Sequence, residues 1–284
     1  MNHPIALFYP AGKPCWKNPE LLSINRLPAR ADFLPFDSPE QAKSNDASST
    51  RCLPLDGEWS FRYFARPDDV PEDVLEDFTA RAPSVTVPGC WTRQGYGSPH
   101  YTNVAMPFPD DYPSVPEANP VGVYQRAVTV PKAWRGKRIV IHFGGAESVL
   151  CAHVDGQPVG LSKDSRLPAE FDITDLARPG RRMVITAAVI KWSDASFIEN
   201  QDQWWMGGLH RSVFLYATEK IWLADIFART DFDPATGGGN LWLTVKAGFP
   251  ADPVPGCTVA AQLYGPSGQA VWKKPLAKEI VTKR

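Results

Sequence analysis

The chain has 284 residues, of which 43% are apolar and 21% charged, a composition typical of a globular protein with room for two domains. Thirty lysines and arginines face 31 acidic residues, so no basic excess is present to attract a nucleic-acid backbone. The longest apolar run near the N-terminus, Ile5–Phe8, is too short for a signal peptide, and no stretch reaches membrane-spanning length. We therefore expect a cytoplasmic protein without nucleic-acid or membrane partners.

The counts of four residue types, cysteine, proline, glycine and tryptophan, narrow the fold class and the cellular compartment further. Five cysteines are an odd number, widely spread and without a CxxC pair, which predicts free buried thiols in a reducing compartment rather than disulfides or a zinc site. The chain also carries 28 prolines, 21 glycines and 10 tryptophans. Many turns and many large rings favour an all-β fold.

Residues 1–50 contain many prolines and little strand-like alternation, and they end in the polar run SNDASST. We interpret them as an extended N-terminal arm that packs on another part of the protein. Glu58–Phe64, EWSFRYF, then places Trp59, Phe61 and Tyr63 on one side, the period of a half-buried strand. The acidic segment after it, DDVPEDVLEDF, has room for one or two helical turns.

Further strands are predicted where β-branched and aromatic runs are bounded by Gly, Pro or Asp. They are SVTVP (84–88), VYQRAVTVP (123–131), RIVIHF (138–143), VLCAHV and QPVGLS (149–162), AEFDIT (169–174), RMVITAAVIKW (182–192) and RSVFLYAT (211–218). Asp155-Gly156 between two of them is typical of a type I′ hairpin, because both residues of that turn need positive φ. RMVITAAVIKW is apolar on both faces, as in a central strand with a layer on each side.

Eight or nine strands without a crossover helix predict that residues 51–218 form one antiparallel sandwich of the jelly-roll type. We expect six apolar side chains to be mostly buried in it: Trp59, Phe61, Ile139, Ile141, Val184 and Val189. Residues 219–284 supply four more strand candidates, IWLADIFART, NLWLTVKA, TVAAQLYG and QAVWKKP, separated by loops such as DFDPATGGG. They predict the first part of a truncated immunoglobulin-like sandwich, because a whole one needs about seven strands in about 100 residues.

Strong enzymatic motifs are absent from the sequence. It contains no GxSxG, no phosphate-binding glycine loop, no HExxH and no EF-hand pattern, and its five histidines do not pair at helical spacing. Each histidine is interpreted as a structural or an exposed residue, and His210 is the one that we follow as a possible site residue. Glu199 and Asp202 could be read as the acid pair of a glycosidase, but two acids three residues apart in a loop are poorly placed for a fixed separation. For Glu199 the plain alternative is that it binds backbone amides of its loop.

Ser193–Val213, SDASFIENQDQWWMGGLHRSV, combines carboxylates, amides, paired tryptophans and a Gly-Gly step. Pro88–Phe108 and Leu161–Thr174 share this polar and aromatic character. Sugars are held by carboxylates and amides that bind hydroxyls and by flat rings against C–H faces. The residues that fit this chemistry are Trp91, Tyr101, Asn103, Gln201, Asp202 and Trp204. The alternative for each aromatic residue is that it belongs to the core.

These stretches resemble the large multi-domain β-galactosidases of glycoside hydrolase family 2. The resemblance runs in family order through NPELLSINRLPARADFLPFDS, LDGEWSFRYF, VPGCWTRQGYGSPHYTNVAMPF, EANPVGVY, DGQPVGLSKDSRLPAEFDIT and KWSDASFIENQDQWWMGGLHRSV. It implies a jelly-roll sugar-binding domain of the galactose-binding-like kind, an immunoglobulin-like domain and then a TIM barrel that carries both catalytic glutamates. The catalytic residues would therefore lie outside this chain.

The resemblance also implies site residues and partners. Asp202 falls on the family's acid that binds substrate and a sodium ion, and Asn103, in YTNV, falls on its substrate-contacting asparagine. The intact enzyme would hydrolyse terminal β-galactosides such as lactose with retention, would use sodium and magnesium with the magnesium ligands elsewhere, and would be a homo-oligomer. Asn200 and Trp205 depart from the family pattern and are expected to alter the acceptor side of the pocket.

Two other classes of function stay open on the sequence alone. The chain could be a stand-alone carbohydrate-binding module, or a subunit without catalytic activity that completes a separately encoded barrel. In every case we expect this 284-residue chain by itself to be inactive. Asn103 and Asp202 are predicted to lie on neighbouring loops at one end of the sandwich, with their side chains facing the same exposed cleft.

Overall fold

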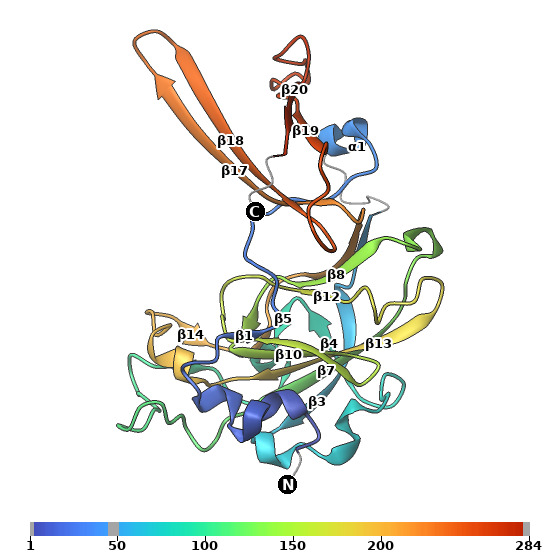
Figure 1. Cartoon of the computed structure of the whole chain (residues 1–284). Coiled ribbons are helices and arrows are strands. Elements are labelled where there is room, and N and C mark those ends of the chain that lie inside the picture. Colours follow the sequence, from blue (N-terminus) through green and yellow to red (C-terminus); the bar gives the residue numbers. More distant parts are fainter. Residues whose placement is uncertain (1–2, 45–50, 281–284) are drawn as a thin grey trace. The chain divides into compact units, whose positions relative to one another are not determined.

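A computed structural model describes residues 3–44 and 51–280 (Figure 1). The described residues divide into two compact units. The first unit runs to Ala29 and resumes from Cys52 to Ala217, and the second unit takes the rest. Part of the SNDASST run lies outside the described residues.

A seven-stranded sheet, sheet A, forms the larger layer of the first unit. Its order is β1 (Ser23–Ile24), β11 (Gln157–Ser162), β10 (Val149–Val154), β13 (Arg182–Ile190), β7 (Val121–Thr129), β3 (Gly57–Phe64) and β4 (Ser84–Val87). Every neighbouring pair in it is antiparallel. Asp155 and Gly156 connect β10 to β11 with φ of 47° and 75°, which confirms the predicted hairpin turn.

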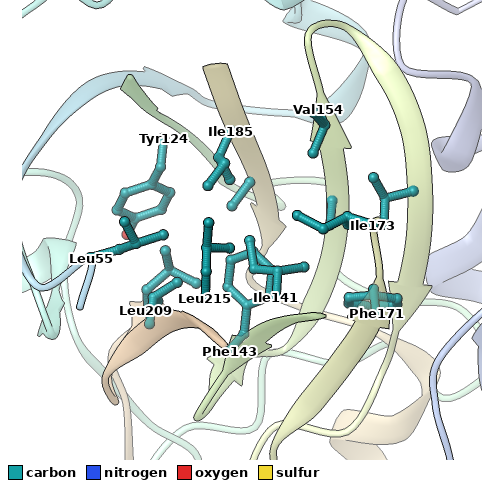
Figure 2. Packing of buried hydrophobic residues seen from close by; sticks show 14 of the residues in the cluster. Leu55, Tyr124, Ile141, Phe143, Val154, Phe171, Ile173, Ile185, Leu209 and Leu215 are labelled. Carbon is teal, nitrogen blue, oxygen red and sulfur yellow. The ribbon is translucent and has the colours of Figure 1, made fainter. Parts of the chain in front are cut away.

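The second layer is the four-stranded sheet B. Its order is β12 (Ala169–Asp172), β8 (Arg138–Phe143), β16 (Val213–Thr218) and β2 (Cys52–Pro54). Apolar side chains from the two sheets meet between the layers, where Figure 2 shows Tyr124 and Ile185 of sheet A facing Ile141 and Leu215 of sheet B. The six side chains predicted to be buried are all at most 7% exposed. The antiparallel jelly-roll sandwich is therefore confirmed.

Sheet A is also covered on its outer face. Ile5, Phe8 and Trp16, from the N-terminal 3-10 turns η1 (Ala6–Phe8) and η3 (Cys15–Lys17) and the residues next to them, pack there with alternate residues of β10 and β13. This second cover explains why the β13 sequence is apolar on both faces. The residues predicted to form one arm thus divide, because those up to Ala29 belong to the first unit and those from Arg30 to the second.

Short elements connect the layers of the first unit. The 3-10 turns are η2 (Pro10–Gly12), η4 (Pro67–Asp69), η5 (Glu72–Leu75), η6 (Trp91–Gln94), η7 (Lys132–Trp134) and η8 (Asp194–Phe197). The turns η4 and η5 lie where the sequence predicts helical turns. Five short strands cross the loops: β5 (Gly89–Cys90), β15 (Gly208–Leu209) and β9 (Ala146–Glu147) form one small sheet, and β6 (His100–Tyr101) and β14 (Trp204–Trp205) form another.

Among its described residues the second unit contains two antiparallel hairpins and one short helix, α1 (Pro39–Ser44). β17 (Trp222–Asp233) pairs with β18 (Gly238–Gly248), and β19 (Thr258–Ala261) pairs with β20 (Leu276–Glu279). The predicted DFDPATGGG loop is shorter than expected, because Asp233 accepts hydrogen bonds from Ala235 N (2.9 Å) and Thr236 Oγ1 (2.7 Å) and closes the turn tightly. The fourth predicted strand lies later, at β20. The immunoglobulin-like assignment of this unit stays a prediction. No helix among the described residues is long and apolar enough to cross a membrane.

Candidate functional site

Two loops of the first unit meet where the sequence places its candidate residues. In the β6–β14 ladder Tyr101 faces Trp204 and His100 faces Trp205. Beyond the ladder Asn103 Nδ2 donates to Asp202 Oδ1 at 2.9 Å, and both residues are exposed. Asn103 and Asp202 are therefore brought together as predicted, although they are 99 positions apart.

Four side chains form what we call the Asp202 cluster: Tyr101, Asn103, Asp202 and Trp204. The Tyr101 hydroxyl donates to Asp202 Oδ1, and this hydrogen bond raises the pKa of Tyr101. The Trp204 ring stacks on the Tyr101 ring with centroids 5.1 Å apart, and its side chain is 54% exposed. The cluster thus presents a carboxylate, an amide and a flat ring on one exposed side, which is the set of groups that binds sugars.

Two aromatic residues that the sequence allowed at the site belong to the core instead. Trp91 is fully buried against Phe61 and Tyr63. Trp205 is also fully buried, with its ring centroid 5.2 Å from that of Trp192. In β14 the Trp205 side chain points away from the face that carries Trp204. Its expected effect on the acceptor side of a pocket stays a prediction.

The amides near Asp202 take different positions. Gln201 is exposed beside the cluster, and its side chain donates to Ile198 O at 3.5 Å. Asn200 Oδ1 accepts a hydrogen bond from the Thr102 hydroxyl, and Thr102 is buried. This bond ties the two loops together next to the cluster, so Asn200 contributes to the join between the loops.

Glu199 does not pair with Asp202. Its carboxylate accepts hydrogen bonds from the backbone N of Ser165 (3.0 Å) and from the Ser165 hydroxyl, and burial raises its pKa. The Asp202 carboxylate instead faces Tyr101 and Asn103. Glu199 therefore fastens its loop to residue 165, close to the plain alternative that the sequence allowed.

An ion pair with a buried carboxylate contacts the loop that carries Asp202. Glu147 is 3% exposed, and its Oε2 accepts the backbone N–H groups of Met206 (2.9 Å) and Gly207 (2.7 Å). Its Oε1 accepts from Arg166 Nη2 at 3.0 Å. Gly207 and Gly208 have φ of 76° and 120°, which explains the Gly-Gly step: the chain turns there in a conformation that favours glycine.

Two buried lysines hold other parts of these loops. Lys163 Nζ lies 2.6 Å from Asp194 Oδ1 and 2.8 Å from the carbonyl oxygen of Asn18. Lys191 Nζ donates to the carbonyl oxygen of Ser98 at 2.9 Å, shortly before β6, and burial lowers its pKa to about 8. Both loops of the site are thus anchored by charged side chains whose burial is almost complete.

Three charged residues of the site were not predicted from the sequence: Glu147, Arg166 and Lys191. The sequence contained a signal for two of them. Glu147 and Lys191 are charged residues within or at the end of otherwise apolar runs, and a charge that is buried with such a run needs a partner.

His210 is half-buried with a pKa lowered by burial, and it packs over Gly145. All five cysteines are free as predicted, but only Cys15 and Cys151 are buried.

Possible metal ligands are scattered among the described residues. No group of three or more His, Cys, Asp or Glu side chains gathers anywhere in residues 3–44 and 51–280. Asp202 Oδ1 is shared by two donors, whereas its Oδ2 accepts no hydrogen bond from the described residues. One free carboxylate oxygen fits a weakly bound hard cation that takes its other ligands from neutral oxygens.

Comparison with known proteins agrees with this geometry. Residues 53–219 match the sugar binding domain of glycosyl hydrolases family 2. The chain is 40% identical over 228 residues to a β-galactosidase of Psychromonas ingrahamii and 38% identical over 237 residues to one of Yersinia enterocolitica. These alignments cover 80% and 83% of this chain but 22% of each relative, so the chain spans about a fifth of their length.

Solved structures support the fold alone. The β-glucuronidase of Bifidobacterium dentium superposes with a TM-score of 0.61 over 82% of this chain and 41% of that chain, at 20% identity. The β-glucuronidase of Ruminococcus gnavus gives a TM-score of 0.58 over 82% of this chain and 39% of that chain, at 17% identity. With the sandwich, the converging loops and the family match together, the chain belongs to glycosyl hydrolases family 2, and residues 53–219 are its sugar binding domain.

Proposed function

We propose that this chain is the N-terminal portion of a retaining β-galactosidase that hydrolyses terminal β-galactosides such as lactose. In this proposal the first unit supplies loops that position the substrate, and the catalytic glutamates lie in a TIM barrel of the same protein. The observation that carries it is the Asp202 cluster, in which Asn103 meets Asp202 at 2.9 Å beside an exposed Trp204 ring. The identity to β-galactosidases supports the choice of substrate.

The charges of the cluster favour a neutral sugar. Of its four side chains Asp202 is the only one that is charged at neutral pH, and it is an anion. A galactosyl hydroxyl can donate to a carboxylate, whereas the carboxylate of a glucuronide would be repelled by it. The likeness to β-glucuronidase structures therefore does not extend, in this proposal, to their substrate.

Asp202 is also our proposed ligand for a sodium ion. Its Oδ2 is available, and a hard cation prefers carboxylate and neutral oxygen ligands. Magnesium, which the family resemblance implies, would be held by residues outside this chain. The cation would help to hold the carboxylate in place against a sugar hydroxyl.

The chain alone should bind galactosides weakly and hydrolyse none. Retaining hydrolysis requires two carboxyl groups about 5 Å apart on either side of the glycosidic bond. The Glu199 carboxylate is instead hydrogen-bonded to Ser165. An exposed cluster encloses little of a ligand that consists mostly of solvated hydroxyls, so we expect millimolar affinity, on the order of 4 kcal/mol.

The test compares the 284-residue chain with the product of the complete reading frame that contains it. With a chromogenic β-galactoside, the complete product should turn over and the chain alone should not, and a chromogenic β-glucuronide should be a poor substrate for both. Asp202→Asn in the complete product should raise KM about tenfold or more, since it removes a charge-assisted hydrogen bond, and should weaken activation by sodium. Asp175→Asn, a change at another exposed acid of the sandwich, serves as the control.

Other outcomes would overturn the proposal. A reading frame without a barrel, together with galactoside binding by the chain, would favour a carbohydrate-binding module. Restoration of activity by mixing the chain with a separately encoded barrel would favour an assembly subunit. Turnover by the chain itself, abolished by Glu199→Gln, would move catalysis into the loop.

A further inference from the structure

The Asp202 cluster is exposed, so burial alone does not fix its geometry. Asn103 and Asp202 are both on the surface, and Trp204 is 54% exposed. Exposed side chains keep a defined arrangement only when the backbone beneath them is held. Other residues must therefore hold the backbone that carries Asn103, Asp202 and Trp204.

The two tryptophans of β14 point in opposite directions. Successive side chains in a strand alternate between its faces. Trp204 lies outward on the Tyr101 ring, and Trp205 lies inward, fully buried. Fixing the inward ring therefore fixes the direction of the outward one.

Arg166 contacts the chain on both sides of Trp204. Its guanidinium lies 5.3 Å from the centroid of the Trp205 ring. The Gln203 amide, oriented with its oxygen toward Arg166, accepts from Nη2 at 2.6 Å and from Nε at 3.3 Å. One planar cation thus binds the residue before Trp204 and the residue after it, which suits the several donors that a guanidinium presents in one plane.

Glu147 holds this cation and the end of the loop at once. Its Oε1 pairs with Arg166, while its Oε2 accepts from the backbone of Met206 and Gly207. A carboxylate that is 3% exposed is tolerated only if its charge is compensated and its oxygens are bonded, and three donors do so here. Removing the arginine would leave a buried anion with only backbone donors.

We propose that Arg166 and Glu147 are positioning residues for the Asp202 cluster. The ion pair holds Gln203, Trp205 and residues 206–207, and so sets Trp204 on Tyr101 and Asp202 against Asn103. The relevance to a sugar rests on the proposed function. The arrangement itself does not, and it can be tested without a sugar.

The first test is hydrogen–deuterium exchange on the 284-residue chain. In Arg166→Gln we expect exchange in residues 199–207 and 100–105 to become about tenfold faster, since a hydrogen bond to a charged group is lost, while β13 keeps its protection. Arg166→Lys should recover part of the protection, because it keeps the charge but not the planar fork. Arg182→Gln, which breaks an ion pair with Asp77 (2.7 Å) elsewhere in the same unit, should leave both loops unchanged.

The second readout is specific to the cluster. In NMR spectra of 13C-tyrosine-labelled protein, assigned with Tyr101→Phe, the ring signals of Tyr101 should move toward their values in an unstructured chain in Arg166→Gln and in Glu147→Gln. The change follows if the Trp204 ring, whose centroid lies 5.1 Å from that of the Tyr101 ring, no longer keeps a fixed position on it. General destabilisation would not change these signals in folded protein.

Two results would overturn the inference. One is unchanged loop exchange together with unchanged Tyr101 ring signals in both variants. The other is an equal rise of exchange in the loops and in β13, which would mean that the pair only stabilises the fold. Neither result depends on whether the complete protein cleaves galactosides, so failure of this inference and failure of the proposed function can be told apart.

Discussion

Sheet A of the first unit and the β17–β18 hairpin of the second both contain apolar strands, but they differ in how far the apolar side chains are buried. In β10 all six residues are buried, because one face meets sheet B and the other meets the N-terminal turns. In the hairpin Phe227 is 61% exposed, Phe232 66% and Trp242 45%. Alternation therefore predicts a strand, whereas burial needs a second layer that the strand itself does not specify.

The largest expected difference between the two regions is the cost of truncating a phenylalanine. Phe61 is fully buried, with ring centroids 4.7 Å from Tyr124 and 4.8 Å from Tyr96. Phe61→Ala should lower the free energy of unfolding of the first unit by about 3 to 5 kcal/mol, because it removes apolar contacts and leaves a cavity. Phe227→Ala should change the stability of the chain by no more than about 0.5 kcal/mol.

Urea unfolding followed by hydrogen–deuterium exchange measures both variants and assigns each loss to a unit. Comparable losses of unfolding free energy in Phe61→Ala and Phe227→Ala would contradict the expected difference between the two regions. They would mean that the hairpin packs in solution as tightly as the sandwich does.

The next effect is a dependence of stability on pH that only the closed sandwich can produce. His153 in β10 is 1% exposed, and burial lowers its pKa from 6.5 to about 4. Between these pH values the unfolded chain binds a proton that the folded chain does not. The free energy of unfolding is therefore highest above pH 6.5 and falls as the pH falls toward 4, by about 3 kcal/mol at most.

Stability curves at several pH values check this expectation. His153→Gln should lose the fall in that window, and His100→Gln, which changes a partly exposed histidine, should keep it. An unchanged slope in His153→Gln would show that other groups cause the acid sensitivity.

The fold of the first unit was predictable because its signals are local and repeated. The RIVIHF strand is found with the predicted bounds, and the Asp155-Gly156 turn has the expected conformation. The short strands β6 and β14 were not predicted, because two-residue ladders depend on contacts between distant loops rather than on periodicity.

The candidate site was predictable in part. Asn103 and Asp202 were found through a family resemblance and through residue chemistry, and the structure brings them together. Trp91 and Trp205 could not be told from exposed rings, because a tryptophan in a polar stretch has the same composition signal whether its ring turns in or out. The Arg166–Glu147 pair joins residues 19 positions apart, and no pattern in the sequence predicts such a partnership.

A smaller effect is expected where a methyl group is added to a glycine of each region. A Cβ on Gly122 in β7 would lie 2.6 Å from Trp91 Cε3 and 2.7 Å from Phe61 Cε2, so rings of the filled core would have to move. Gly122→Ala should lower the free energy of unfolding by about 2 to 3 kcal/mol. A Cβ on Gly239 in β18 would meet its nearest neighbour, Asp231 O, at 3.5 Å, and Gly239→Ala should be nearly neutral.

Thermal unfolding of the two glycine variants gives this contrast directly. If Gly122→Ala were as stable as the unaltered chain, the core around Trp91 would have to contain free space that its contacts do not suggest.

The smallest effect concerns the aspartates at the two hairpin turns. Asp155 has a φ of 47°, and its Oδ1 accepts the backbone N–H of Val184 at 2.7 Å, so it joins the turn to the neighbouring strand of sheet A. Asp155→Ala loses this bond and places a residue with a Cβ but no local acceptor in the left-handed region, which should cost about 1 to 2 kcal/mol. Asp155→Asn should recover most of the lost stability, because asparagine tolerates this φ and keeps an acceptor.

The Asp233 side chain bonds only within its own turn, to Ala235 and Thr236. Asp233→Ala should therefore speed up hydrogen exchange in residues 230–240 without changing the unfolding of the first unit. Hydrogen–deuterium exchange measures both variants, and an Asp233→Ala change that spread into sheet A would contradict the separation of the two regions.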